Sequence, residues 1–131
     1  MKNSMESNQL FLSISQMIEK SKHQIAISVN VTISMLYWQI GHKINEEILS
    51  NKRAEYGKQI VVSLARQLES EYGASFSDKN LRRMIQFAII YPNKEIVVSL
   101  IRQLSWTHIL VLLPIENAIK RDFYIQLCIH E

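Results

Sequence analysis

The first third of the chain contains almost nothing that would stop a helix. From about Ser7 to Ser50 there is no proline and only one glycine, Gly41. Apolar residues recur there at helical spacing: Leu10, Ile14, Ile18, Ile25, Val29, Ile33, Leu36, Ile40, Ile44 and Ile48. This spacing predicts either one long helix or two helices joined near Ser21–His23.

One part of this stretch has the spacing of a helix-pairing seam. Ala26, Val29, Ile33, Leu36 and Ile40 follow one another in steps of 3, 4, 3 and 4 residues. The seam covers about two heptads, which is too short to indicate a coiled coil by itself. It is consistent with packing in the domain's own core and with pairing to a second copy of the chain.

Gly41 lies inside the same helical pattern. Glycine in a helix interior costs roughly 1 kcal/mol relative to alanine. We therefore expect a neighbouring backbone to approach the helix closely at this position.

The most sharply bounded helix is predicted between Ser77 and Pro92. The Ser77 hydroxyl is a good N-cap acceptor, and Asp78 places a negative charge in the first turn, where the helix dipole favours it. Pro92 cannot continue the helix and pushes Tyr91 out of the α region. A preceding helix is expected from about Lys58, with Ile60, Val61, Leu64, Ala65, Leu68 and Tyr72 facing inward. It ends at Gly73, a plausible cap glycine.

Within the bounded helix, apolar and cationic residues lie on different faces. Leu81, Met84, Ile85 and Ala88 form an apolar stripe. Another face carries the candidate nucleic-acid-binding residues Lys79, Asn80, Arg82, Arg83 and Gln86. Residues 76–94 hold four basic residues and one acidic residue, whereas the rest of the chain holds 11 of each. This one segment therefore carries the whole net charge of +3. Such a segment is expected of a nucleic-acid contact, but the charge pattern alone favours a solvated helix face that is merely basic.

Three further helices are expected in the last third of the chain. The first covers residues 95–104, and its sequence from Ile96 repeats that of Ile60–Leu68 at eight of nine positions. We interpret this as two helices with the same amphipathic pattern rather than as a repeat protein. Ser105 is expected to cap a short apolar helix over 106–113, with His108 in a cap or core role. A last helix covers 116–130, with Ile119, Phe123, Tyr124 and Leu127 facing inward.

Together these patterns predict an all-α fold: a compact bundle of five to seven helices with a long N-terminal helix and a helix-turn-helix-like pair. We expect a single domain over residues 1–131, with the helix-turn-helix-like part at about 58–92 and residues 1–8 flexible. The chain has one cysteine, Cys128, which excludes an internal disulfide and a cysteine-rich zinc site. The first residues lack the apolar core of a signal peptide, and the run Ile109–Ile115 is too short to span a bilayer. These features predict a cytoplasmic protein without a membrane partner.

Five segments, in order, resemble one bacterial family. They are YWQIG (37–41), EYGK (55–58), FSDKNLRRM (76–84), QLSWTH (103–108) and RDFY (121–124). These segments are similar to the N-terminal domain of YhcG-like proteins, and the similarity extends from about residue 12 to the end. The resemblance implies a helical DNA-binding module that precedes a PD-(D/E)-x-K nuclease domain. That nuclease domain is absent from this sequence.

The residues themselves indicate no catalytic site. No Asp or Glu stands two residues before a Lys, and the four histidines show no metal-ligand spacing. The three glycines are isolated, so no phosphate-binding loop is present. We therefore expect no enzyme activity, no cofactor and no metal.

Two functions remain open. The first is a non-catalytic DNA-binding module. In it Lys79, Arg82 and Arg83 contact phosphates or guanine edges, and Asn80 and Gln86 read adenine. A homodimer through the N-terminal helix would then place two copies on adjacent half-sites. The second is a protein–protein interaction or dimerisation module, which binds a nuclease domain or another protein and makes no contact with nucleic acid.

Overall fold

The computed structural model describes residues 2–49 and 54–130, and all regular structure within them is helical. This confirms the all-α prediction. The six α-helices are α1 (Lys2–Ile44), α2 (Ala54–Tyr72), α3 (Asp78–Ile90), α4 (Lys94–Gln103), α5 (Trp106–Leu112) and α6 (Ala118–His130). A π-helical turn (Asn45–Leu49) follows α1, and a 3-10 turn (Ala74–Phe76) precedes α3. Helix α2 begins four residues before the predicted Lys58.

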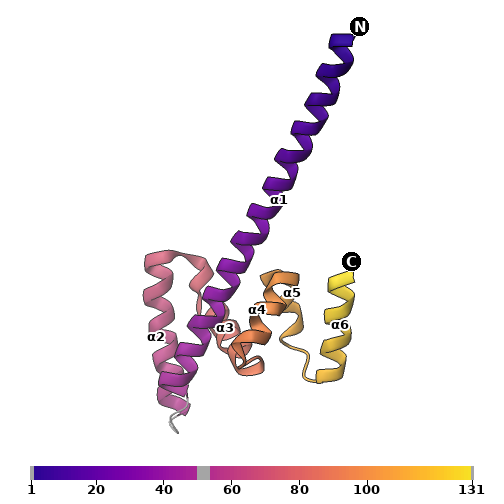
Figure 1. Ribbon diagram of the computed structural model, residues 1–131. Helices are drawn as coiled ribbons and strands as arrows, with labels where there is room; N and C mark the ends of the chain where they lie inside the picture. Colours follow the sequence, from indigo (N-terminus) through magenta and orange to yellow (C-terminus); the bar gives the residue numbers. More distant parts are fainter. Residues whose placement is uncertain (1, 50–53, 131) are drawn as a thin grey trace.

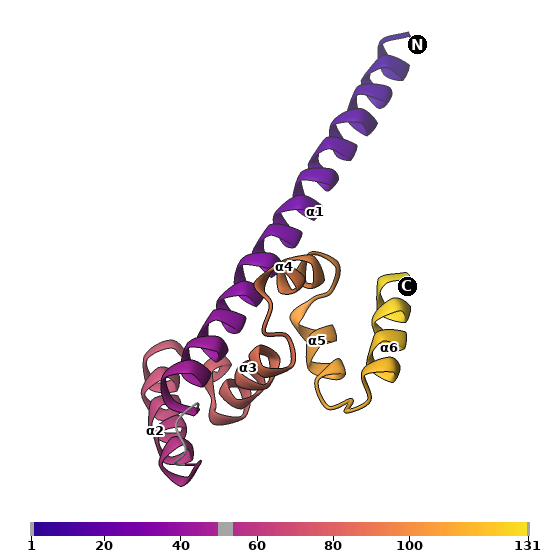
Figure 2. The same cartoon turned by 60° about the horizontal axis from the view of Figure 1, so that its bottom comes forward.

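Helix α1 is one continuous helix and not two helices joined near Ser21–His23. Its C-terminal part packs against α3 and α4, whereas its N-terminal part projects far beyond the other helices (Figures 1 and 2). The backbone is helical from Lys2, because no glycine or proline interrupts this segment. The flexibility expected of residues 1–8 stays a prediction. The compact bundle thus consists of the C-terminal part of α1 together with α2–α6.

The close approach expected at Gly41 is present. A Cβ atom on Gly41 would overlap the backbone carbonyl of Met84 and would lie 2.8 Å from the amide nitrogen of Ile85. Helices α1 and α3 therefore cross backbone to backbone at this point. No residue other than glycine fits the crossing without a shift of one helix.

Two polar side chains of α1 fix the segments that follow α3. The Trp38 indole donates a 2.8 Å hydrogen bond from Nε1 to the carbonyl oxygen of Tyr91, just after α3 ends. Asn30 donates from Nδ2 to the carbonyl oxygens of Ile101 and Leu104, at 3.3 Å each. Its Oδ1 accepts from the Trp106 amide at 3.4 Å. Asn30 therefore satisfies backbone groups at the end of α4 and at the start of α5, where a helix has no partners of its own.

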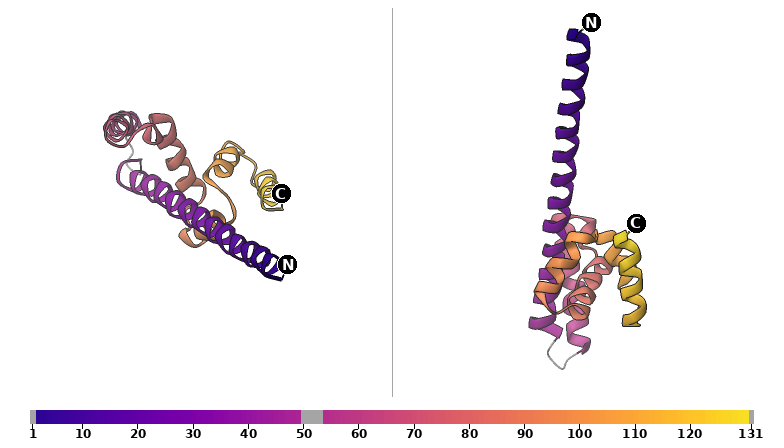
Figure 3. Two further views of the ribbon diagram at one scale, coloured as in Figure 1. Left: turned by 90° about the horizontal axis from the view of Figure 1, so that it is seen from above. Right: turned by 45° about the vertical axis from the view of Figure 1, so that its right-hand side comes forward.

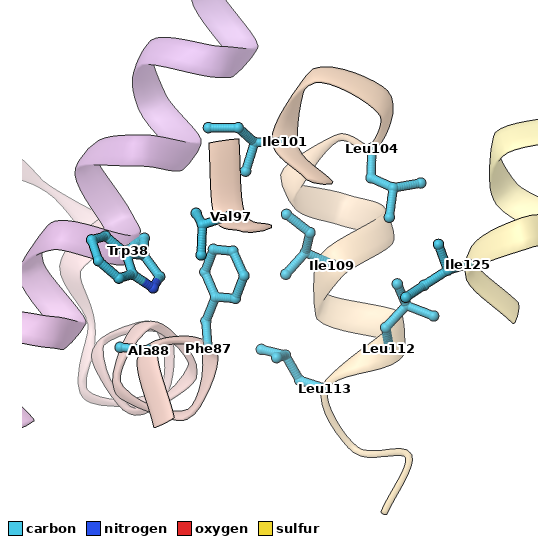
Figure 4. Packing of buried hydrophobic residues seen from close by; sticks show 10 residues of the cluster. All are labelled: Trp38, Phe87, Ala88, Val97, Ile101, Leu104, Ile109, Leu112, Leu113 and Ile125. Carbon is cyan, nitrogen blue, oxygen red and sulfur yellow. The ribbon is translucent and has the colours of Figure 1, made fainter. Parts of the chain in front are cut away.

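The bundle contains two apolar clusters. One joins α1, α3, α4, α5 and α6 and includes Trp38, Phe87, Ala88, Val97, Ile101, Leu104, Ile109, Leu112, Leu113 and Ile125 (Figure 4). The other joins α1, α2 and α3 and includes Ile44, Val61, Ala65, Leu81, Met84 and Ile85. Helix α3 contributes to both clusters, and the predicted stripe of Leu81, Met84, Ile85 and Ala88 is buried in full.

The repeated sequence is also buried in a repeated way. Val61 and Ala65 of α2 are buried, and so are Val97 and Ile101 at the corresponding positions of α4. The interpretation that two helices share one amphipathic pattern is confirmed.

The predicted helix boundaries are confirmed at their caps. The Ser77 hydroxyl accepts from the Asn80 amide at 3.3 Å, and Gly73 has a φ of 102°. Helix α3 ends before Pro92, with Tyr91 in a non-helical conformation. Ser105 caps α5, and His108 completes a capping box by accepting the Ser105 amide at Nδ1, 3.4 Å away.

The predicted inward face of α6 is wrong. Ile119, Phe123, Tyr124 and Leu127 are exposed, with Ile119 at 81%. Ile125 is buried instead, and Cys128 and Ile129 are half-buried against the same cluster. Apolar residues occupy both faces of this helix, and the spacing rule alone does not choose between them. Tyr72, predicted to face inward from α2, is also exposed, at 69%.

From the close crossing at Gly41 we predict the effect of a substitution on stability. Gly41→Ala adds a methyl group where the Met84 backbone lies, so the two helices must separate. We expect a loss of about 1–3 kcal/mol in the free energy of unfolding, as in other overpacked sites. The gain of roughly 1 kcal/mol in helix propensity does not offset this. Urea denaturation measures the change.

A control on the same helix is Gln39→Ala, at an exposed position. This variant should change the free energy of unfolding by no more than about 0.5 kcal/mol. Equal or greater stability of Gly41→Ala would contradict the backbone crossing.

Asn30 makes a second prediction. Asn30→Ala removes the partner of two carbonyls and one amide at the α4–α5 junction, so we expect a loss of about 1–3 kcal/mol. Thr32→Ala is the matched control, because Thr32 bonds only to the Ser28 carbonyl of its own helix. Thermal unfolding of both variants measures the difference. Similar melting temperatures for the two would show that Asn30 does not hold the junction.

Candidate nucleic-acid interface

Helix α3 separates a buried face from a polar outer face, as the sequence predicted. Leu81, Met84 and Phe87 have no exposed surface, while Lys79 and Arg82 are exposed. The apolar side is held against α1 and α2 through the two clusters, so the polar side is turned away from α1. Figure 3, seen from above, shows α2 and α3 lying next to each other on one side of α1.

Two of the candidate residues carry charge that no carboxylate offsets. Lys79 and Arg83 form no ion pair with any residue in the described part of the chain. Lys79 is exposed and Arg83 is half-buried. Both cations are therefore available to an anionic partner.

Arg82 is paired within its own helix. Its Nη2 atom lies 3.1 Å from Oδ2 of Asp78, and its Nε donates to the Asp78 carbonyl at 3.4 Å. The two side chains are 66% and 41% exposed. An exposed pair of this kind contributes little to stability, so Arg82 can exchange Asp78 for a phosphate at low cost.

The two amide side chains are used by the fold. Asn80 donates from Nδ2 to the carbonyl oxygen of Ala74 at 3.3 Å, which closes the turn before α3. Gln86 donates from Nε2 to the carbonyl oxygen of Leu113 at 3.0 Å and so ties α3 to the end of α5. Reading adenine requires both the donor and the acceptor of an amide. Each side chain uses one of its two N–H donors in these bonds to the fold, which restricts its orientation.

Two cations that the sequence analysis did not select lie on α2, beside α3. Arg66 lines a hollow of about 570 Å³ together with Glu69 and Asp78. Lys58 lines a second hollow of about 450 Å³ together with Arg82 and Asp78. Lys58 and Arg66 are eight residues apart, which is about two helical turns, so they lie on the same side of α2. This spacing is the feature of the sequence from which their shared position could have been predicted.

The α2–α3 basic face is the set Lys58, Arg66, Lys79, Arg82 and Arg83. Three of these cations, Lys58, Arg66 and Arg82, line the two hollows together with Glu69 and Asp78, which gives a net charge of +1 there. Lys79 and Arg83 line neither hollow and add two further positive charges on α3. Such a concentration of one sign attracts a polyanion.

The phenol of Tyr91 adds no charge near the end of α3. Burial raises its pKa above the ordinary 10.0, and the nearby Arg121 guanidinium opposes this only in part. Tyr91 is therefore neutral at physiological pH, and the basic face keeps its charge.

Other kinds of site are not indicated by the described residues. Among them, no three His, Cys, Asp or Glu side chains gather in a metal-binding arrangement. No single helix in the described ranges is long and apolar enough to cross a membrane. Helices α3 and α4 reach that length and composition only as a pair bent by 120°, and their apolar faces belong to the two clusters.

Comparison with known proteins confirms the resemblance noted in the sequence. The profile of the family described as "DUF1016 N-terminal domain" matches residues 13–131. The chain is 33% identical over 89 residues to "Putative nuclease YhcG" of Escherichia coli (strain K12). That alignment covers 67% of this chain and 24% of the relative, so the chain spans about a quarter of the relative's length. No solved structure matches the chain significantly.

The family match covers far more than half of the chain and includes every segment that carried the resemblance. The E. coli relative carries the name "Putative nuclease YhcG", and the similarity to it identifies this chain as a nuclease-associated module. The chain belongs to the DUF1016 N-terminal domain family, as a YhcG-like N-terminal domain.

Proposed function

We propose that this protein is a non-catalytic DNA-binding module that contacts the phosphate backbone through the α2–α3 basic face. The observation that carries the proposal is the pair of unneutralised cations, Lys79 and Arg83, on the outer face of α3. On α2, Lys58 and Arg66 line hollows with Arg82 and Asp78 of α3, so cations stand on two adjacent helices. A strip of cations on adjacent elements suits a regularly charged backbone better than a single small anion.

The contact we propose is with phosphates more than with bases. Asn80 and Gln86 each donate one N–H to the fold, at the Ala74 turn and at the end of α5, so both side chains are restricted in orientation. Phosphate contacts position a protein on a duplex and carry no sequence information. Binding should therefore be weak, steeply salt-dependent and nearly independent of sequence.

The absence of catalysis is also part of the proposal. Kinship with a protein named as a nuclease supports a role at nucleic acid. The matched segment is described as an N-terminal domain, and it covers about a quarter of that relative. In the arrangement that we propose, this module brings nucleic acid to a catalytic partner.

A second candidate function is a protein–protein interaction module. It is favoured by the exposed apolar residues of α1 and α6, such as Ile25 at 63% and Ile119 at 81%. The two functions use different surfaces, because the cations of the basic face lie on α2 and α3. They can therefore be tested separately.

Charge reversal tests the DNA contact. The double variant Lys79→Glu/Arg83→Glu should bind a short fluorescent duplex at least 10-fold more weakly than the unaltered protein at low salt. The slope of log affinity against log salt should fall by about 2, because two phosphate contacts are lost. Fluorescence anisotropy at several salt concentrations gives both quantities.

The matched control is Lys20→Glu/Lys120→Glu. It makes the same change in net charge at exposed lysines of α1 and α6. This control should keep the affinity and the slope of the unaltered protein. No binding at low salt, or equal losses in both variants, would reject the α2–α3 basic face as the contact.

A further inference from the structure

The projecting part of α1 exposes a long line of apolar side chains. We name this line the α1 stripe, and its members are Phe11, Ile14, Ile18, Ile25, Val29, Ile33 and Leu36. Each of them is between 41% and 69% exposed. Their steps of 3, 4, 7, 4, 4 and 3 residues match seven turns of a straight α-helix. The stripe therefore stays on one side of α1 for about 38 Å.

The stripe does not serve the core of its own domain. Ser34, Trp38 and Gly41 of the same helix are buried, and Gly41 and Trp38 contact α3 and its end. Ile33 and Leu36 point away from this side and remain 41% and 44% exposed. The domain can thus form completely while the stripe stays free for a partner.

A single helix of this kind is not stable by itself in water. Most helical stability in proteins comes from packing an apolar face and not from propensity. The N-terminal part of α1 projects beyond every other helix in Figures 1 and 2 and in the right-hand view of Figure 3. Within the described residues, α1 first meets the other helices at His23, Ala26 and Ile27, which line a hollow together with the α4–α5 junction. A partner is needed to hold this segment helical.

We propose that the partner is a second copy of this chain, whose α1 pairs antiparallel with the first along the α1 stripe. The spacing of the four central members of the stripe supports this choice, because it is symmetric about the gap at Ser21 and Lys22. An antiparallel partner centred there places Ile18 opposite Ile25 and Ile14 opposite Val29. In a two-fold pair each residue i contacts a residue j and j contacts i, so this symmetric spacing brings apolar side chains opposite apolar side chains.

The size of the stripe fits a helical dimer. An apolar side chain of this size carries on the order of 100 Å² of apolar surface. Seven of them at about half exposure offer roughly 400 Å² per copy for the centre of the contact. Standard stable interfaces bury about 800 Å² per partner, and flanking polar side chains along seven turns make up the difference.

The antiparallel pair changes one expectation from the sequence. It places the two Gly41 crossings, and with them the two α3 helices, on the order of 60 Å apart along the pair. Adjacent half-sites on DNA are about 34–36 Å apart. In this arrangement the two copies do not occupy adjacent half-sites. Pairing through α1 and DNA binding through α2 and α3 are therefore separate proposals, and rejecting one does not reject the other.

Sedimentation equilibrium of the whole chain tests the pairing. The unaltered protein should have twice its mass of 15.3 kDa. Ile18→Glu/Ile25→Glu, at the centre of the stripe, should raise the dimer dissociation constant at least 100-fold. Leu12→Glu/Ile27→Glu is the matched control. It changes two exposed apolar residues of the same helix that lie off the stripe, and it should remain dimeric. Fluorescence of Trp38 and Trp106 checks that the bundle stays folded in each variant.

A monomeric unaltered protein would overturn the proposal. So would equal dissociation of the stripe variant and the control. Association that persists in the stripe variant would overturn it as well and would point to the exposed residues of α6 instead.

Disulfide formation tests the orientation. In a Cys128→Ser background, a mixture of the variants Ile14→Cys and Val29→Cys should form a mixed disulfide on mild oxidation. Neither variant alone should cross-link efficiently. Efficient cross-linking of Ile14→Cys with itself would indicate parallel helices and would overturn the antiparallel pair.

Discussion

The backbone crossing of α1 and α3 at Gly41 is the contact on which the rest of the structure depends. Because no Cβ atom intervenes, the two helices lie close enough for α3 to be buried on one whole side. Trp38 lies one turn before the crossing and holds the end of α3 through Tyr91. Asn30 lies about three turns before it and holds the junction of α4 and α5. One face of one helix thus sets the positions of three others.

The same crossing decides which side of α3 meets solvent. Burial of Leu81, Met84 and Phe87 turns Lys79 and Arg82 outward. Arg82 lines a hollow together with Lys58 of α2. The outward position of these charged side chains is therefore a consequence of how the opposite side of α3 packs against α1. The α1 stripe has the same origin, because the side of α1 that faces α3 leaves the opposite side uncovered. A basic face and an apolar stripe on different elements suit a module with two kinds of partner.

The features predicted correctly from the sequence are those that depend on neighbouring residues. Ser77, Gly73 and Pro92 act within one or two turns of themselves, so their roles as helix boundaries follow from local physics. Gly41 was also predictable, because a glycine in a long helix costs stability unless another backbone comes close. The buried side of α3 followed from a single clear stripe.

The features that the sequence did not predict depend on contacts between distant segments. Helix α6 has apolar residues on both faces, and only its position next to Leu104 and Leu112 selects Ile125 (Figure 4). The role of Asn30 requires knowing that α4 ends and α5 begins 71–76 residues later in the chain, next to it. The position of Gln86 on α3 suggested that it could read a base. In the structure it donates a hydrogen bond to the end of α5, which is distant in the sequence. The contribution of Lys58 and Arg66 likewise appears only when α2 lies beside α3.

The central claim is that the α2–α3 basic face is where this protein meets nucleic acid. The most direct test is an NMR titration of the isotope-labelled protein with a short DNA duplex, which follows every backbone amide at once. The account predicts that the largest shift changes fall on residues 58–86, along α2 and the outer side of α3, and weaken with added salt. Changes concentrated on the projecting part of α1 or on α6, with residues 58–86 unaffected, would contradict it.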